Sequence, residues 1–399
     1  MSRISRNCSI VFIIVTNDRQ LITPLKEARR FMVDCFKAVG SNQTHAEIVS
    51  DNLLEADYRG HYTHGMNRLE TYINCLQHGL VSPNAVPTID KETEATALVN
   101  GNNGFGAVVG QYCMNLAIEK AKNTGIGLVV CHASNHYGMA GMYALQAIKK
   151  GFIGFSATNS PCLMVPTRAK KCLDGLDVSD HHDNMYFAHC CSKKSALGTN
   201  PMGFGVPAKD GDSFVLDMAT TVAALGKIEI QRRKGKPIPP GWALNKEGKV
   251  ETDADIAFQD KLLVPLGGEE INAGYKGYGL AVVVDVLSGI LSGSNYGPKV
   301  PNFGTLENIG HAFIAINPKV FAPGVENRMS DLMNHLRNME PVDPNLPVLV
   351  AGDPSRKNME KVQKDGGLSY VQNQHDTNKK LAQSLNVSPM KSILIIGHT

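Results

Sequence analysis

The residues with the clearest chemical potential lie at positions 63–68, which read Thr-His-Gly-Met-Asn-Arg. The guanidinium of Arg68 can hold a carboxylate through two parallel hydrogen bonds, and the imidazole of His64 can move a proton beside it. A second polar run at 134–138, Ser-Asn-His-Tyr-Gly, contributes His136. Together these groups favour an enzyme acting on a small molecule over a scaffold protein.

Each group also has a non-catalytic interpretation. His64 and Arg68 are four residues apart, so one helical turn would place them on the same side. They could equally be a capping histidine and a surface arginine. His136 could be a satisfied core histidine at a strand end. Its position just after an apolar strand, where active sites of α/β proteins tend to lie, favours a catalytic role.

Helices and strands alternate along the chain, which predicts a mixed α/β fold. Thr23 and Pro24 predict a helix start, and Thr44 with Glu47 predicts a capping box for a second helix ending at Ala56. That helix would place 57–68 at a corner between helices. Hydrophobic periodicity predicts further helices at 103–122, 139–150 and 277–291, and strands at 126–131, 152–158, 213–216, 311–316 and 347–351.

Composition excludes several classes of protein. The 399 residues allow two domains or one interlocked unit, and 43% hydrophobic with 19% charged residues is typical of a globular protein. The net charge of +3 gives no general electrostatic case for binding nucleic acid or an anionic membrane. No apolar run approaches the roughly 20 residues of a membrane span. We therefore expect neither kind of partner.

The cysteines and the first residues bear on location. Nine cysteines without paired spacing indicate reduced thiols in an intracellular protein. The first 17 residues contain Arg3 and Arg6 and no acid before Asp18, a weak feature of mitochondrial presequences. We expect a cytoplasmic protein, with a mitochondrial location as the less favoured alternative.

Segment 172–194 interrupts the regular pattern. It carries Asp-His-His-Asp at 180–183 and His-Cys-Cys at 189–191, and pairs of lysines flank it. Histidine and cysteine can hold zinc, but this spacing matches no standard zinc finger. We expect no metal site, and interpret the segment as a surface loop or a gene-model insertion.

A standard Rossmann domain is not expected. The nearest approach to Gly-x-Gly-x-x-Gly is 101–106, where Val109 stands in place of the last glycine. Other polar turns follow later in the chain. The glycines and the lysine at 274–279 suit phosphates at a helix N-terminus, Asp217 could cap a helix or orient a ligand, and 352–357 follows an apolar run.

Taken in order, these motifs resemble those of the malate/L-lactate dehydrogenase family, which is unrelated to Rossmann-type enzymes and includes ureidoglycolate and sulfolactate dehydrogenases and Δ1-piperideine-2-carboxylate reductase. The resemblance runs from about residue 20 to 385, excluding 172–194. The motifs that carry it are at 59–68, 134–138, 198–201, 217–221, 226–227, 240–243 and 274–279.

The resemblance implies a nicotinamide-binding domain on a largely antiparallel sheet and a helical domain interleaved from both chain ends. It implies a homodimer with active sites near the subunit interface. We expect an extension at 1–19, a helical domain at 20–100 completed by about 320–399, and a central domain at 101–319. The expected reaction transfers hydride between NAD or NADP and a small 2-hydroxy acid. The alternative is a catalytically silent dimeric relative whose pocket is disturbed by 172–194.

The resemblance also implies roles for single residues. His136 and His64 are alternatives for the acid/base, and His136 is favoured for a hydroxy acid. The substrate-binding residues implied are Thr63, Arg68, Thr199 and Lys227. The cofactor-binding residues implied are His136, Gly138, Ser160, Asp217, Met218, Ala219, Lys276, Gly277, Gly352, Asp353 and Pro354.

Overall fold

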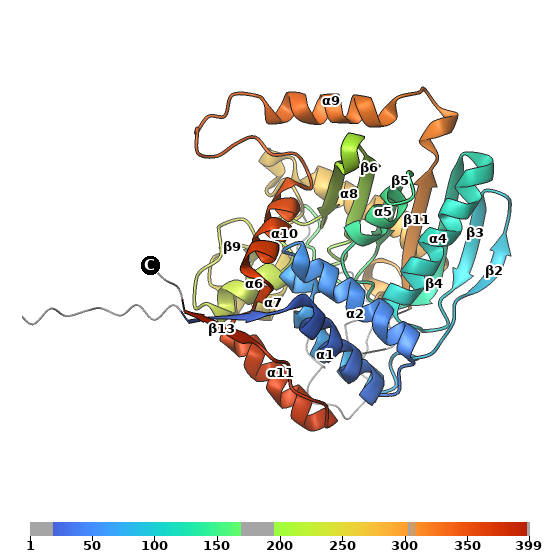
Figure 1. Cartoon of the computed structure of the whole chain (residues 1–399). Helices are drawn as coiled ribbons and strands as arrows, with labels where there is room; N and C mark the ends of the chain where they lie inside the picture. Colours follow the sequence, from blue (N-terminus) through green and yellow to red (C-terminus); the bar gives the residue numbers. More distant parts are fainter. Residues whose placement is uncertain (1–18, 169–194, 302–304, 306–307, 397–399) are drawn as a thin grey trace, which may run out of the picture.

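A seven-stranded sheet forms the centre of the protein in the computed structural model, which describes residues 19–168, 195–301, 305 and 308–396 (Figure 1). Only β3 and β4 run parallel, and every other neighbouring pair is antiparallel. The predicted mixed α/β class with a largely antiparallel sheet is therefore confirmed. In spatial order the strands are β2 (Thr88–Glu92), β3 (Thr96–Asn100), β4 (Ile126–Ser134), β11 (Ile309–Ile316), β5 (Ile153–Thr158), β6 (Met202–Pro207) and β7 (Ser213–Met218).

Helices α4 (Gly106–Thr124) and α5 (Gly141–Ile148) pack on this sheet and form its core. Buried side chains from both layers meet there, including Ile118, Val129 and Phe313. Burying this apolar surface removes it from water and stabilises the fold. Strand β4 is therefore held rigidly, and the residues that follow it are placed precisely.

A helical domain is assembled from both ends of the chain. Strand β1 (Arg19–Thr23) pairs with β12 (Leu368–Ser369) and β13 (Ile393–Ile396), and all pairings are antiparallel. The helices are α1 (Leu25–Ala38), α2 (Gln43–Tyr58), α3 (Leu69–Gln77) and α11 (Gln372–Leu385). Their buried side chains share one core, so the predicted interleaving is confirmed, and α11 lies beside α1 in Figure 1.

Two predicted helix starts are wrong in detail. Thr23 lies in β1, where its hydroxyl meets Ser392 Oγ at 2.8 Å, and Pro24 is the cap residue of α1. Helix α2 begins at Gln43 because the Asn42 side chain accepts a hydrogen bond from His45 N at 2.8 Å. An asparagine cap satisfies a free amide as well as threonine does, so the predicted capping box at Thr44 is not used.

The remaining elements surround the sheet. A small sheet holds β8 (Ala243–Leu244), β9 (Val250–Glu251) and β10 (Leu262–Leu263). The further helices are α6 (Leu225–Arg233), α7 (Ala254–Asp260), α8 (Gly274–Asp285), which continues into a π-helical turn at Val286–Ile290, α9 (Val325–Arg337) and α10 (Asp353–Asp365).

The predicted strand at 347–351 is wrong. This segment has an irregular backbone. One backbone hydrogen bond joins it to β7, from Val215 N to Ala351 O at 3.1 Å. Pro347 cannot donate to a ladder, which disfavours a strand there. Segment 172–194 lies outside the described residues.

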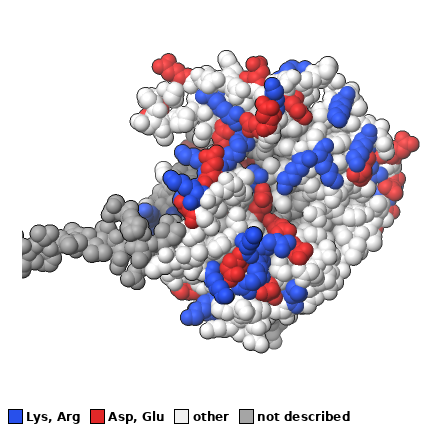
Figure 2. Space-filling view, viewed as in Figure 1, with Lys and Arg blue, Asp and Glu red and all other residues white. Residues whose placement is uncertain are grey.

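Basic and acidic side chains are interspersed on the face shown in Figure 2. In the described part of the chain, no helix is long and apolar enough to cross a membrane.

Candidate active site

The corner between α2 and α3 is built from two short 3-10 turns, Tyr62–His64 and Met66–Arg68. Gly65 joins them with a non-helical backbone, so His64 and Arg68 do not share one helical turn as the spacing predicted. They remain close because Arg68 Nε donates to Thr63 O at 2.8 Å. Thr63 Oγ1 in turn lies 2.9 Å from His64 Nδ1. The corner is thus a compact set of polar groups.

The two candidate catalytic histidines meet at this corner. His136 follows the end of β4, and its ring stacks on that of His64 with centroids 5.6 Å apart and planes 17° apart. Burial, with Arg68 nearby, lowers the pKa of His136 to about 3. Burial, with His136 and Arg68 nearby, holds the pKa of His64 well below its ordinary value. Both imidazoles are therefore neutral at neutral pH.

Tyr72 is a site residue that the sequence analysis did not identify. Its hydroxyl lies 2.5 Å from His136 Nδ1. It stands one helical turn after Arg68, and that spacing was the available signal. The contact fixes the His136 ring, because a hydrogen bond to one ring nitrogen sets the role of the other.

Arg68 has an unforeseen acidic partner. Its Nη2 donates to Glu229 Oε2 on α6 at 3.2 Å, and Glu229 also binds Arg233 at 2.6 Å. The second terminal nitrogen of Arg68, Nη1, has no hydrogen bond to any described residue. Glu229 therefore orients the guanidinium group of Arg68. The Nη1 edge of this group keeps N–H donors for another anion.

Helix α6 lies directly against the corner. A Cβ added at Gly226 would be 2.7 Å from Thr63 Cγ2, so glycine permits this close packing. Lys227, the next residue, is exposed, and its ammonium group makes no ion pair with the residues described. The sequence prediction that Lys227 approaches the same site stays a prediction.

Ser160 and Thr199 form a second polar pair. Their hydroxyl oxygens lie 3.3 Å apart, and Asn200 Oδ1 accepts from Ser160 N at 3.3 Å. Thr220 N donates to Thr199 O at 2.8 Å, which ties the turn to the second residue after β7. A Cβ at Gly198 would lie 2.2 Å from Ser160 O, so this tight turn requires glycine.

The predicted positions at the start of α8 lie near this second pair rather than at the histidines. Leu266 N donates to Thr220 O at 2.9 Å, and a Cβ at Gly277 would meet Leu266 O at 2.2 Å. Lys276 is exposed. Gly277 therefore has a packing reason of its own, and its role in cofactor binding is untested.

A cavity of about 360 Å³ brings several predicted cofactor positions together. Its lining includes Asp217 from β7, Gly141 at the start of α5, and Gly352 and Pro354 beside α10. His61 and Met139 also line it, and each stands three residues from a candidate catalytic histidine. The cavity thus shares chain segments with the corner. Met218 and Ala219 continue directly from Asp217.

Asp217 has a definite structural partner. Its Oδ2 accepts from Gly141 N at 2.7 Å and so satisfies a free amide in the first turn of α5, whose N-cap residue is Ala140. Burial raises the pKa of Asp217, while His61 opposes that rise. Gly138 has φ +80°, and a Cβ there would lie 1.9 Å from Asn52 Oδ1. These contacts shape the loop between β4 and α5 that borders the cavity.

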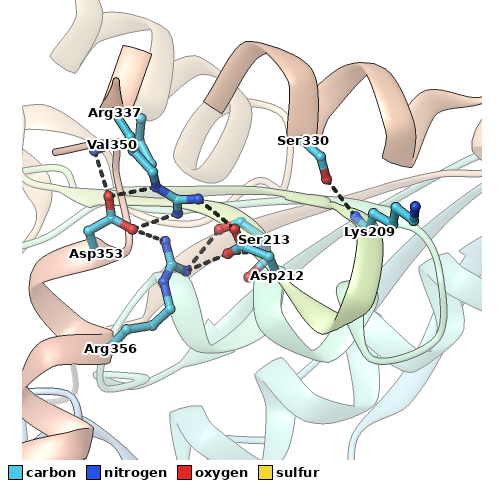
Figure 3. A network of polar contacts seen from close by, with 8 residues as sticks. All are labelled: Lys209, Asp212, Ser213, Ser330, Arg337, Val350, Asp353 and Arg356. Carbon is cyan, nitrogen blue, oxygen red and sulfur yellow. Dashed lines mark hydrogen bonds and ion pairs between the residues drawn. The ribbon is translucent and has the colours of Figure 1, made fainter. Parts of the chain in front are cut away.

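The carboxylate of Asp353 forms ion pairs with two arginines, as Figure 3 shows. Arg337 on α9 lies 2.7 Å from both Asp353 and Asp212, and Arg356 pairs with the same two carboxylates. Burial opposes ionisation, but Arg337 and Arg356 outweigh it and hold the pKa of Asp353 well below its ordinary value. This network, defined as Asp212, Arg337, Asp353 and Arg356, fixes the backbone of Gly352 and Pro354 at the cavity.

The polar groups of the candidate site are hydrogen-bond donors and acceptors that suit an organic ligand. Among the residues that the structure describes, no three His, Cys, Asp or Glu side chains are close enough to hold a metal ion. The His and Cys residues of 181–191 lie outside the described residues. The cavity volume is at the lower end of the roughly 300–1,000 Å³ typical of ligand pockets, which suits part of a dinucleotide.

The corner places two neutral imidazoles beside a guanidinium, groups that can move a proton next to a bound carboxylate. The model of the malate/L-lactate dehydrogenase family matches residues 23–177 and 182–377, so the chain belongs to that family. Its class is that of the hydroxy-acid oxidoreductases. The resemblance drawn from the motifs is confirmed.

Individual relatives and a solved structure support the same family. The malate dehydrogenase of Pyrococcus abyssi is 41% identical over 319 residues, which is 79% of this chain and 82% of that protein. The L-sulfolactate dehydrogenase of Methanocaldococcus jannaschii is 32% identical over 373 residues, or 92% and 98% of the two chains. The structure of malate dehydrogenase from Pyrococcus horikoshii OT3 superposes with a TM-score of 0.79 at 34% identity, covering 93% of this chain and 97% of that one. Nothing in these likenesses supports a catalytically silent relative.

Proposed function

We propose that this enzyme transfers a hydride between a nicotinamide dinucleotide and a small 2-hydroxy acid, forming the 2-oxo acid. The observation that carries the proposal is the stacked pair of neutral imidazoles, His64 and His136, beside Arg68. Oxidation of the hydroxyl group requires a base that takes up its proton while hydride leaves the carbon that bears this group. A neutral imidazole can accept that proton.

Each residue of the corner has a part in this reaction. The free donors of Arg68 hold the substrate carboxylate, with Glu229 orienting the guanidinium from the other edge. His136 accepts the hydroxyl proton, and Tyr72 fixes its ring. A bound nicotinamide supplies the hydride acceptor. In the reverse direction the same histidine returns the proton to the carbonyl oxygen.

The cavity lined by Asp217, Gly352 and Pro354 is the proposed place of the cofactor's nucleotide part. The Asp217 carboxylate suits hydrogen bonds from ribose hydroxyls better than a phosphate. Ser160, Thr199 and the start of α8 would border the remaining part. The choice between NAD and NADP is left to experiment.

Substrates with a second acidic group are favoured. The relatives from Pyrococcus abyssi and Methanocaldococcus jannaschii are named for malate and sulfolactate, which both carry an acidic group beyond the 2-hydroxy acid. Lys227, on the helix that packs against Thr63, has an ammonium group that makes no ion pair with the described residues. We assign the second acidic group of the substrate to this lysine.

A homodimer in the cytoplasm completes the proposal. Helix α8 and the π-helical turn after it leave five large apolar side chains partly or largely in solvent: Val282, Val283, Val286, Ile290 and Leu291. A contiguous exposed apolar face of this kind typically marks a protein interface. A second copy of the chain is the partner proposed for it.

The test is turnover of 2-oxo acids with NADH and with NADPH, followed by loss of absorbance. Arg68→Ala should raise KM by about 10- to 100-fold, since hydrogen bonds to charged groups contribute roughly 1.5–3 kcal/mol. His136→Ala should lower kcat by about 10²- to 10⁴-fold, the range of general acid–base catalysis.

Two outcomes would contradict the proposal in different ways. An active His136→Ala enzyme together with an inactive His64→Ala enzyme would move the proton transfer to His64. Absence of turnover and of cofactor binding in the unaltered protein would favour a silent relative.

A further inference from the structure

Asp57 lies beneath the catalytic corner and has no part in the chemistry described so far. It is the penultimate residue of α2, and its side chain is completely buried. Its Oδ2 accepts from Met66 N at 2.9 Å and from Tyr370 OH at 2.7 Å. One carboxylate oxygen therefore joins the second turn of the corner to a residue just before α11.

Gly65 is shaped to admit this carboxylate. A Cβ added at Gly65 would lie 1.8 Å from Asp57 Oδ1, far inside any real contact. The same Oδ1 is buried and forms no hydrogen bond with any residue that the structure describes. The carboxylate and the corner backbone are thus packed as one unit, and only glycine at position 65 permits this approach.

We propose that Asp57 is the positioning residue of the active site: it fixes the corner 62–68 so that His64 faces His136, and Tyr370 holds Asp57 in place. The proposal rests on the proposed function and adds a residue to it. Met66 N is two residues from His64 and two from Arg68, so a shift of this amide moves both groups. A displacement of about 1 Å at a catalytic group can cost roughly 100-fold in rate.

The ionisation of Asp57 gives this role a pH dependence. Burial raises the pKa of Asp57 to about 7, although Tyr370 OH and Met66 N lower it. The titratable groups packed against it are the phenols of Tyr370 and Tyr62, whose own pKa values are raised by burial. Both stay neutral near pH 7. An ionised carboxylate accepts stronger hydrogen bonds than a neutral one, so the corner is held more firmly above pH 7.

Three variants separate these contributions. Asp57→Ala removes both accepted hydrogen bonds and should lower kcat by about 10- to 100-fold. Asp57→Asn keeps an oxygen for Met66 N and Tyr370 OH, so it should recover most of that loss and lack the limb near pH 7 in the kcat profile. Tyr370→Phe, which touches neither histidine nor Arg68, should lower kcat and leave KM nearly unchanged. Asp51→Asn, the same change on the exposed face of α2, is the matched control.

A failure of the positioning role can be distinguished from a failure of the proposed function. If the unaltered enzyme turns over but Asp57→Asn and Tyr370→Phe match it in kcat and in pH profile, the positioning role is refuted, even if Asp57→Ala fails to fold. If the unaltered enzyme does not turn over, the proposed function fails. The positioning role is then measured by the NMR shifts of the His64 ring, which Tyr370→Phe should move and Asp51→Asn should not.

Discussion

At the scale of single residues, the side chains of the candidate site are held in place by hydrogen bonds to neutral and acidic partners. Tyr72 fixes His136, Glu229 orients Arg68, and Asp57 supports the turn that follows His64. Each partner is distant in sequence from at least one group that it contacts. The motif residues could be identified as candidates from their types and order. Of their partners, Tyr72 had a sequence signal in its spacing from Arg68, but Glu229 and Asp57 had none, because burial and approach depend on how α2, α3 and α6 pack.

Lys227 carries a prediction at this scale. Replacing Lys227 with Ala should raise KM for 2-oxo acids with a second acidic group by about 10-fold, because one charge-assisted hydrogen bond is lost. KM for lactate-type substrates, which have no second acidic group, should change little. Steady-state kinetics on a matched pair of substrates measures the difference.

Lys234→Ala is the control for this substitution, since Lys234 is an exposed lysine that immediately follows the same helix. Equal changes for both substrate types would show that Lys227 does not read the second acidic group.

At the scale of elements, the network of Asp212, Arg337, Asp353 and Arg356 joins α9 and α10 to the hairpin of β6 and β7 (Figure 3). The wall of the cavity at Gly352 and Pro354 is held by these charges rather than by a strand. The run at 347–351 is apolar like a strand, but its backbone is held at separate points: Ala351 O accepts from Val215 N, and Val350 N donates to Asp353 Oδ2.

Breaking this network should loosen the cavity. Arg337→Met should lower the free energy of unfolding by about 1–2 kcal/mol, more than an exposed ion pair contributes, because two carboxylates lose a shared partner. KM for the cofactor should rise as well. Urea unfolding and cofactor titration measure the two effects.

Arg328→Met is the control on the same helix, because among the described residues its guanidinium binds backbone carbonyls of 322 and 323 and no carboxylate. If Arg337→Met changes the free energy of unfolding and the KM for the cofactor no more than Arg328→Met does, the network does not anchor this wall of the cavity.

At the scale of the whole molecule, the two chain ends complete one helical domain, and the apolar face of α8 remains uncovered. We expect the protein to be a dimer at micromolar concentration. Charged residues at Val286 and Ile290, introduced as Val286→Glu with Ile290→Glu, should shift it to a monomer, because burying unpaired charge opposes association. Light scattering after size-exclusion chromatography gives the mass directly.

Ile256→Glu is the control, since Ile256 is an exposed apolar residue on α7, away from this face. A monomeric unaltered protein, or a double variant that stays dimeric, would exclude α8 as the interface.

The sequence by itself determined the chemical groups and the order of the elements. Types and spacing at 63–68 and 134–138 predicted a carboxylate site with a proton-transfer group, and the absence of a glycine-rich fingerprint excluded a Rossmann domain. Local periodicity predicted most helices and strands, because it reflects which face of each element is buried.

Only the tertiary structure decided how these pieces meet. It brought His64 and His136 into a stack, paired β1 with β13, and placed Asp57 of α2 between Met66 and Tyr370. The physical reason is that pairing across hundreds of residues depends on the burial of shared surfaces, which no local pattern encodes. The same burial holds the imidazoles of His64 and His136 neutral and raises the pKa of Asp57, so the ionisation of the candidate site is a property of the folded chain.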